Sequence, residues 1–148
     1  MYKKILVPLD QSAGAEAALP VAADLARADQ AVIRLLHVAP PPTAIVAEGR
    51  VIAYADQESE RLQHIWEVYL REAARQLAGV RVEYAVRFGE PAEEILEEAR
   101  ESGADLIAMA THGRSGVARL MLGSVAEAVL RRSEVPVVLV RHGLAVAA

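Results

Sequence analysis

Three glycines and a serine near the carboxyl end of the chain form the pattern that is best suited to chemistry. Gly113 and Gly116 follow a buried-looking apolar run, and Gly123-Ser124 opens a segment with helical periodicity. Glycine lets backbone N–H groups come close to a ligand, because no Cβ stands in the way. Ser124 stands at a predicted helix start, where unpaired N–H groups and the helix dipole favour an anion. The pattern therefore predicts a phosphate site, and hence a bound nucleotide.

The elements that must position this loop are indicated by five unbroken apolar runs. Continuous Val, Ile and Leu runs are typical of strands buried on both faces, as in a parallel sheet covered by helices. The predicted strands are Ile5–Leu9, Val32–Val38, Val80–Val86, Leu106–Ala110 and Pro136–Val140. Helical patterns alternate with them, at Ala15–Ala28, Asp56–Leu77, Pro91–Ser102 and from Ser124 to about Arg132. This order predicts a single α/β domain over residues 1–148, an open, doubly wound five-stranded parallel sheet with helices on both faces.

Local signals refine the boundaries of these elements. Ser12 is predicted to cap the first helix, and Ser124 with Glu127 three residues later forms a predicted capping box. Pro20 lies inside the first helical pattern, so this helix is expected to kink or to begin later. The segment from Pro40 to Ala55 has no clear periodicity and is predicted to be a mobile loop or a lid over a site.

The ends of the first and fourth predicted strands carry further candidate ligands. In open α/β sheets, ligands bind beyond the strand ends, where neighbouring connections leave to opposite faces. Asp10 ends the first strand and Thr111–Gly113 ends the fourth, so a strand order of 3-2-1-4-5 would place them on either side of that crevice. Asp10 is then a candidate acceptor for ribose hydroxyls, or alternatively a helix cap or a solvated strand end. The candidate N–H donors to phosphates belong to Gly113, Gly123, Ser124 and Val125.

Composition limits the partners of such a site. The net charge of −4 and the pI near 5.6 argue against nucleic-acid binding, which needs a basic surface. The absence of cysteine excludes disulfides and thiolate chemistry. No apolar run approaches the roughly 18 residues of a membrane span, and the N-terminal run is too short for a signal peptide. We therefore expect a cytoplasmic protein that binds neither nucleic acid nor membrane.

Taken together, these motifs resemble the universal stress protein family. The resemblance runs from Lys4 to Arg141 and rests on the following residues: Asp10, Gly89-Glu90-Pro91, His112-Gly113, Gly123-Ser124 and the last predicted strand. It implies a Rossmann-like, adenine nucleotide alpha hydrolase-like fold with strand order 3-2-1-4-5. It also implies a homodimer joined along Pro136–Val140, and an apolar edge strand favours such pairing on general grounds. The family has members that bind ATP and members that do not.

For the ATP-binding members, the resemblance implies several further site residues. Pro8 and Asp10 would lie at the ribose, and the backbone of Val38 would meet the edge of the adenine. Met109 and Ala110 would line the ribose side. The implied ligand is ATP, or ADP or AMP, and Mg²⁺ or Mn²⁺ would arrive on its phosphates and take few protein ligands.

Three positions near the glycine-rich loop need separate interpretation. Ala110 stands where the ATP-binding members have the first glycine of their motif, so a positive φ there would strain the backbone by about 1 kcal/mol. Its methyl group could also crowd the ribose. Arg114 and Arg119 are candidates to balance triphosphate charge. We include His112 among the nucleotide-binding residues, although its expected role is a hydrogen bond within the turn rather than that of a general base.

Two functions stay open at this point. We expect an ATP-binding regulatory protein of the stress response; the alternative is a dimeric member that binds no ATP and acts through protein interactions, which Ala110 favours. A dedicated phosphoryl-transfer enzyme needs a metal site and a residue that orients the nucleophile. The chain has no GxxxxGK[ST] loop and no second carboxylate at a strand end, so we expect at most slow hydrolysis of ATP.

Overall fold

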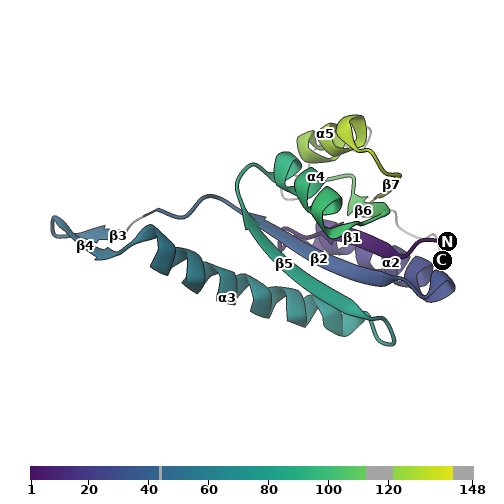
Figure 1. The fold of residues 1–148 in the computed structure, drawn as a ribbon, viewed down its shortest axis with the longest axis horizontal. Helices are drawn as coiled ribbons and strands as arrows, with labels where there is room; N and C mark the ends of the chain where they lie inside the picture. Colours follow the sequence, from purple (N-terminus) through teal and green to yellow (C-terminus); the bar gives the residue numbers. More distant parts are fainter. Residues whose placement is uncertain (44, 113–121, 142–148) are drawn as a thin grey trace.

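A five-stranded parallel sheet organises the computed structural model, which describes residues 1–43, 45–112 and 122–141 (Figure 1). The strand order is β5-β2-β1-β6-β7. The strands are β1 (Lys4–Pro8), β2 (Val32–Ala39), β5 (Val82–Phe88), β6 (Leu106–Ala110) and β7 (Val137–Val140). In chain order this corresponds to 3-2-1-4-5, so the predicted fold class and topology are confirmed.

Helices cover both faces of this sheet. They are α1 (Ala13–Glu16), α2 (Ala18–Asp29), α3 (Ala55–Ala73) with the 3₁₀ turn η1 (Ala74–Gln76), α4 (Pro91–Ser102) and α5 (Ser124–Arg132). In β1, Ile5 and Val7 pack in one apolar core with α2 and α3, whereas Leu6 packs in a second core with α4 and α5. The strands read as unbroken apolar runs because both of their faces are buried in this way.

The first helical pattern is divided into two helices close to Pro20, where a kink or a later helix start was predicted. The α1 helix ends at Glu16, and α2 begins at Ala18 with Pro20 as its third residue. Proline is accommodated there because N–H groups in the first turn have no partner within the helix. Ser12 caps α1 as predicted, since its side chain accepts a hydrogen bond from the N–H of Ala15.

The prediction for the segment from Pro40 to Ala55 was wrong. The chain forms an antiparallel hairpin of β3 (Ile45–Ala47) and β4 (Arg50–Ala53). Glu48 and Gly49 join the strands with φ values of 53° and 74°. Positive φ at both central residues is the geometry of a tight two-residue hairpin turn. The hairpin extends away from the five-stranded sheet rather than over a site (Figure 1).

Other differences from the predicted elements are shifts of strand and helix ends; the helix predicted over Asp56–Leu77 is α3, which ends at Ala73 and is followed by η1. The β5 strand begins at Val82 instead of Val80, because the N–H of Val80 donates to the carbonyl of Leu77 in a turn. The α4 and α5 helices have the predicted boundaries. Among the described residues, no helix combines the length and the hydrophobicity that crossing a membrane requires.

Candidate functional site

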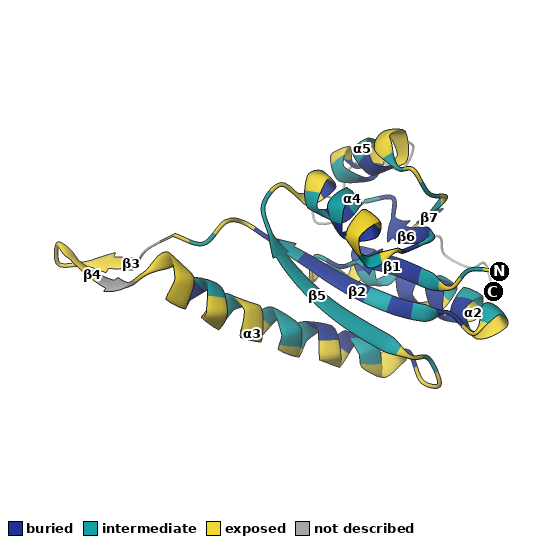
Figure 2. Cartoon of the chain, viewed as in Figure 1, coloured by how far each residue is buried: buried dark blue, intermediate teal, exposed yellow. Residues whose placement is uncertain are grey.

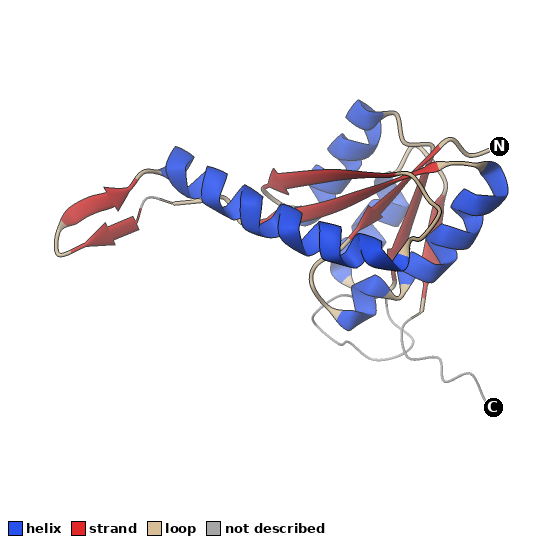
Figure 3. Cartoon of the chain, turned by 90° about the horizontal axis from the view of Figure 1, so that it is seen from below, coloured by secondary structure: helices blue, strands red, loops and turns tan. Residues whose placement is uncertain are grey.

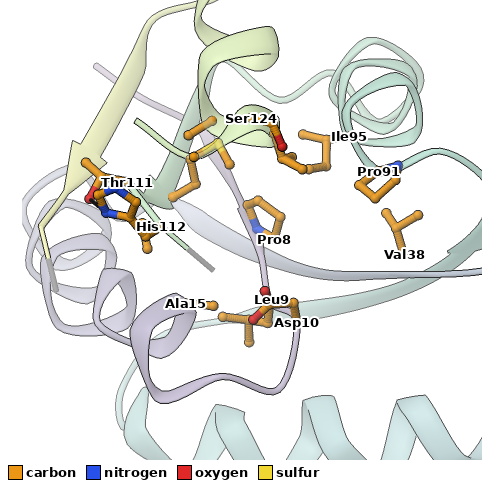
Figure 4. A pocket seen from close by; sticks show the side chains of 15 residues that line it. Pro8, Leu9, Asp10, Ala15, Val38, Pro91, Ile95, Thr111, His112 and Ser124 are labelled. Carbon is orange, nitrogen blue, oxygen red and sulfur yellow. Dashed lines mark hydrogen bonds between the residues drawn. The ribbon is translucent and has the colours of Figure 1, made fainter. Parts of the chain in front are cut away.

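A pocket of about 280 Å³ opens at the carboxyl ends of β1, β2 and β6 (Figure 4). The β1 and β6 strands are neighbours in the sheet, yet the chain after β1 passes to α1 and α2 on one face, and α5 lies on the other. This is the switch point at which open α/β sheets bind ligands. The described lining residues are Pro8, Leu9, Asp10, Ala15, Val38, Pro91, Ile95, Met109, Ala110, Thr111, His112, Gly123, Ser124, Val125 and Ala126.

The pocket brings together nine of the predicted site residues. These are Pro8, Asp10, Val38, Met109, Ala110, His112, Gly123, Ser124 and Val125. Gly113 and Arg114 lie outside the described residues, as do Gly116 and Arg119. Five further lining residues were not predicted: Leu9, Ala15, Pro91, Ile95 and Ala126, whereas Thr111 was predicted at the strand end that flanks the crevice. A signal existed for Pro91, because it belongs to the Gly89-Glu90-Pro91 motif that opens α4.

Asp10 is positioned by the cap of the first helix. Its Oδ1 accepts hydrogen bonds from the backbone N–H of Ser12 at 3.0 Å and from the Ser12 hydroxyl at 2.6 Å. The same hydroxyl oxygen accepts from the N–H of Ala15 at 2.9 Å. Ser12 is therefore the cap, and Asp10 orients it from the pocket wall. A carboxylate held in this way is an acceptor for hydroxyl groups of a ligand.

The backbone of Val38 faces the pocket because β1 ends before β2 does. The last contact of the ladder is the hydrogen bond from the N–H of Leu9 to the carbonyl of Leu36, at 2.8 Å. Since alternate residues of a parallel strand direct their backbone groups to the same side, those of Val38 point beyond the end of β1. The Leu9 carbonyl instead contacts Nδ1 of His37 at 2.7 Å. A carbonyl only accepts, so Nδ1 carries the proton.

His37 anchors an aromatic cluster beneath the β1 turn, a role that the sequence did not reveal. It is 5% exposed, and its ring stacks on Trp66 with centroids 3.7 Å apart. Tyr69 meets both rings edge-on, and its hydroxyl donates to Oε2 of Glu16 at 3.3 Å. Burial, together with the nearby Glu16 carboxylate, raises the pKa of Tyr69, so the phenol stays protonated. Through the bond from His37 to the Leu9 carbonyl, this cluster supports the turn at Leu9–Asp10.

The predicted capping box at Ser124 was wrong. Gly123 is the cap residue of α5 and Ser124 is its first helical residue, with no side-chain capping bond. The carbonyl of Gly123 accepts from the N–H of Glu127 at 2.9 Å. Gly123 was also predicted to donate its N–H to a phosphate. This N–H instead donates to the carbonyl of Thr111 at 2.8 Å. Glycine is favoured because a Cβ would lie 3.1 Å from that same oxygen, which is a crowded contact.

The first turn of α5 supplies the donors on this side of the pocket. The N–H groups of Ser124, Val125 and Ala126 belong to the turn that has no acceptors within a helix. Their partial positive charges form the positive end of the helix dipole, which favours an anion. In Figure 4, Ser124 and Asp10 lie on opposite sides of the pocket. The site thus pairs hydrogen-bond donors with a carboxylate acceptor across a mainly apolar floor.

Ala110 and His112, at and just after the end of β6, both line the pocket. Ala110 is not among the non-glycine residues with positive φ, so alanine causes no backbone strain there, although its methyl group lines the pocket. Nδ1 of His112 lies 3.1 Å from Oγ1 of Thr111, in keeping with a hydrogen bond within the turn. Within the described parts of the chain, no lining residue is Lys or Arg and no three potential metal ligands cluster.

Comparison with known proteins gives a consistent result. The model of the Universal stress protein family matches residues 1–141. Universal stress protein YxiE of Bacillus subtilis is 34% identical over 148 residues, covering 95% of this chain and all of the relative. The structure of MJ0577, a Methanocaldococcus jannaschii protein, superposes with a TM-score of 0.79 at 31% identity and covers 96% of this chain and 97% of its own. A universal stress protein in complex with cAMP superposes with a TM-score of 0.69 at 26% identity, covering 95% and 97%.

Proposed function

This chain belongs to the universal stress protein family, and from that premise we propose that its pocket binds an adenine nucleotide, with ATP as the ligand. The observation that carries the proposal is the pairing of the Asp10 carboxylate with the first-turn N–H groups of α5 across one pocket. A nucleotide needs both, since its ribose presents hydroxyl donors and its phosphates present anionic acceptors. The solved relative that holds cAMP supports an adenine nucleotide in particular.

Each part of the ligand has a counterpart in the pocket. The adenine would lie against apolar side chains such as Ile95, with its polar edge at the backbone of Val38. The ribose would lie beside Pro8, Met109 and Ala110 and bind Asp10. The phosphates would bind the N–H groups of Ser124 and Val125, together with Gly113 and Arg114 as predicted from the sequence, while His112 would hold the turn beside them. Mg²⁺ or Mn²⁺ would bind through the phosphates.

The proposed role is regulatory rather than enzymatic. Among the described lining residues, Asp10 is the only one with a carboxylate. Its Oδ1 already accepts hydrogen bonds from Ser12. A phosphoryl-transfer site would need further positioned charge and a group that orients the nucleophile. We therefore propose a cytoplasmic homodimer, joined along β7, in which the bound nucleotide changes the conformation or the contacts of the protein during stress.

The first test is to denature the purified protein and to separate any released nucleotide by chromatography. We expect ATP or ADP at close to one per chain, or the same stoichiometry after incubation with Mg-ATP. Asp10→Asn keeps an oxygen that can accept from Ser12 but removes the negative charge, whereas Asp10→Ala removes both. Weaker binding in both variants, with the melting temperature of Asp10→Asn unchanged, would support a ligand role. An empty protein that takes up no Mg-ATP would contradict the proposal.

The alternative function, a dimeric member that binds no ATP, rests on the Ala110 methyl group in the pocket wall. Ala110→Gly tests it, because the substitution restores the glycine of the ATP-binding members and removes only that methyl group. If crowding by Ala110 prevents binding, the variant will take up Mg-ATP while the parent protein does not. Equal binding by both proteins would remove the support for the alternative.

A further inference from the structure

The solvent-facing side of α3 carries two large aliphatic side chains at its centre. Ile65 is 43% exposed and Val68 is 55% exposed. Residues three apart are neighbours on a helix surface, so the two side chains form one apolar contact area. Figure 3 shows α3 crossing in front of the five-stranded sheet, and in Figure 2 the side of α3 that faces away from the sheet is mainly exposed, whereas the side toward the sheet is mainly not. The opposite side of α3 is anchored in the core by Leu70 and Ala73.

Opposite charges flank this apolar area at equal distances along the helix. Arg61 stands four residues before Ile65, and Glu72 stands four residues after Val68. Their side chains are 58% and 70% exposed. At about 100° per residue, all four positions fall within about 60° of the helix circumference. We call these four residues the α3 outer face.

We propose that the α3 outer face is a self-association surface, through which two copies of this chain pair with their α3 helices antiparallel. The two-fold axis lies midway between Ile65 and Val68. In this arrangement Ile65 of each copy meets Val68 of the other copy, and Arg61 of each copy meets Glu72 of the other. A two-fold axis repeats every contact, so the interface contains two aliphatic contacts and two pairs of opposite charge.

The order of charges identifies a second copy as the occupant. An antiparallel copy of the same helix presents Glu72 opposite Arg61, and Arg61 opposite Glu72, in addition to the ion pairs that these residues make with Glu58 and Arg75 in their own chain. A parallel copy in register would instead place like charges opposite each other, which is unfavourable. The α3 outer face is thus complementary to itself in one orientation.

This surface is separate from the nucleotide pocket and from the β7 edge. The α3 helix packs on β5 and β2, whereas β7 lies at the other end of the strand order β5-β2-β1-β6-β7. Pairing through α3 therefore leaves the β7 edge accessible, and both surfaces can be used in one assembly. The proposal holds whether or not the pocket binds a nucleotide.

The test is a charge-exchange experiment followed by sedimentation equilibrium of the full chain. Arg61→Glu places two like-charge contacts in the α3 pairing, and so does Glu72→Arg. We expect each variant alone to raise the dissociation constant of the α3 association by about tenfold or more. An equimolar mixture of the two variants should restore association, because each chain then presents the charge that the other requires.

The double variant Arg61→Glu/Glu72→Arg separates this effect from contacts within the helix. Arg61 pairs with Glu58 and Arg75 pairs with Glu72 in the same chain, and the double variant loses both pairs. If the charges act only within the helix, the double variant will be at least as impaired as either single variant. If they act between copies, its association will recover toward that of the parent protein.

A disulfide experiment reports on the same register without changing charge. The chain has no cysteine, so a mixture of Ile65→Cys and Val68→Cys chains can form only engineered bridges. We expect rapid formation of the mixed disulfide dimer under mild oxidation. Unchanged dissociation constants in both charge variants, failure of their mixture to associate, or no preference for the mixed disulfide would overturn the proposal.

Discussion

Ser12 and Ser124 stand close to helix N-termini, yet only Ser12 uses its side chain there. The Ser12 hydroxyl bonds both Asp10 and the N–H of Ala15. At α5 the capping position belongs to Gly123, so the Ser124 hydroxyl is not needed to begin the helix. The two serines therefore offer a direct test of which residue starts which helix.

We predict that Ser12→Ala lowers the free energy of unfolding by about 1 kcal/mol, as loss of a capping side chain does. Ser124→Ala should change it by less than about 0.5 kcal/mol, because no capping bond is lost. Urea denaturation of both variants measures the difference. Equal losses would mean that Ser124 caps α5 after all.

Gly123 is restricted by space rather than by its backbone conformation. Its φ of −61° suits any residue, but a Cβ would meet the Thr111 carbonyl at 3.1 Å. Gly79 presents the opposite case, with a φ of 78° and nothing within 4 Å of an added Cβ. Alanine at either position should destabilise the protein, but for different reasons.

We predict that Gly123→Ala lowers the free energy of unfolding by about 1–3 kcal/mol through crowding, and also weakens nucleotide binding by moving the Thr111 backbone at the pocket. Gly79→Ala should cost about 1 kcal/mol through backbone strain and leave binding unchanged. Calorimetric titration with Mg-ATP, beside thermal unfolding, compares the two. A binding loss in Gly79→Ala as large as in Gly123→Ala would show that destabilisation alone explains the effect.

At the scale of elements, ion pairs join the neighbouring strands β2 and β5 to the helix α4. Glu98 of α4 accepts from Arg34 of β2 at 2.7 Å and from Arg87 of β5 at 3.0 Å. Arg87, at the end of β5, is therefore bound to α4 and does not belong to the pocket. Where β1, β2 and β5 meet, Glu83 lies 3.0 Å from both Lys4 and Arg34.

Glu83 makes part of the stability depend on pH. Its hydrogen bonds from Lys4 and then from Arg34 hold the pKa of this carboxyl below its ordinary value. A lowered folded-state pKa stabilises the protein above the ordinary carboxyl pKa, and this stabilisation is lost as the pH falls through the lowered value. We predict that the unfolding free energy of Glu83→Gln falls less than that of the parent protein between about pH 5 and pH 3. Because Glu83 is 37% exposed, the difference should stay below about 1 kcal/mol in denaturation curves.

At the scale of the whole molecule, β7 leaves one backbone edge without a neighbouring strand in the described sheet. The carbonyls of Pro136 and Val140 accept from Ile107 and Thr111 of the β6 side, so these residues face inward. By alternation, the backbone of Leu139 faces outward, toward the edge at which we propose the homodimer.

We predict that Leu139→Pro halves the mass of the assembly in sedimentation equilibrium while the chain stays folded, because proline removes an outward-facing N–H. Val138→Pro is the matched control, since its N–H faces β6, and it should instead lower the melting temperature. A Leu139→Pro protein of unchanged mass would argue against pairing through this edge. The α3 charge variants act on a different surface, so their effects should be independent of this one.

The elements and the core of the site could be predicted because their signals lie in neighbouring residues. Apolar runs marked the five strands, Pro91 and Gly103 marked the ends of α4, and Asp10, Gly123 and Ser124 marked the pocket. The same local reasoning was insufficient at Ser124, where serine and Glu127 have the spacing of a capping box. In the structure the cap is Gly123, which is bonded to the Thr111 carbonyl, a contact that the local spacing does not report.

What escaped the sequence consists of contacts between distant segments. Ile95 of α4 joins the pocket because a crossover lays α4 over the strand ends, and His37 reaches Leu9 because β2 continues past the end of β1. Hydrophobic periodicity and turn chemistry act over a few residues, so the chain alone specifies its strands and most helix ends. Which side chains meet across the sheet depends on strand register and helix packing, and these are set when the separate elements come together.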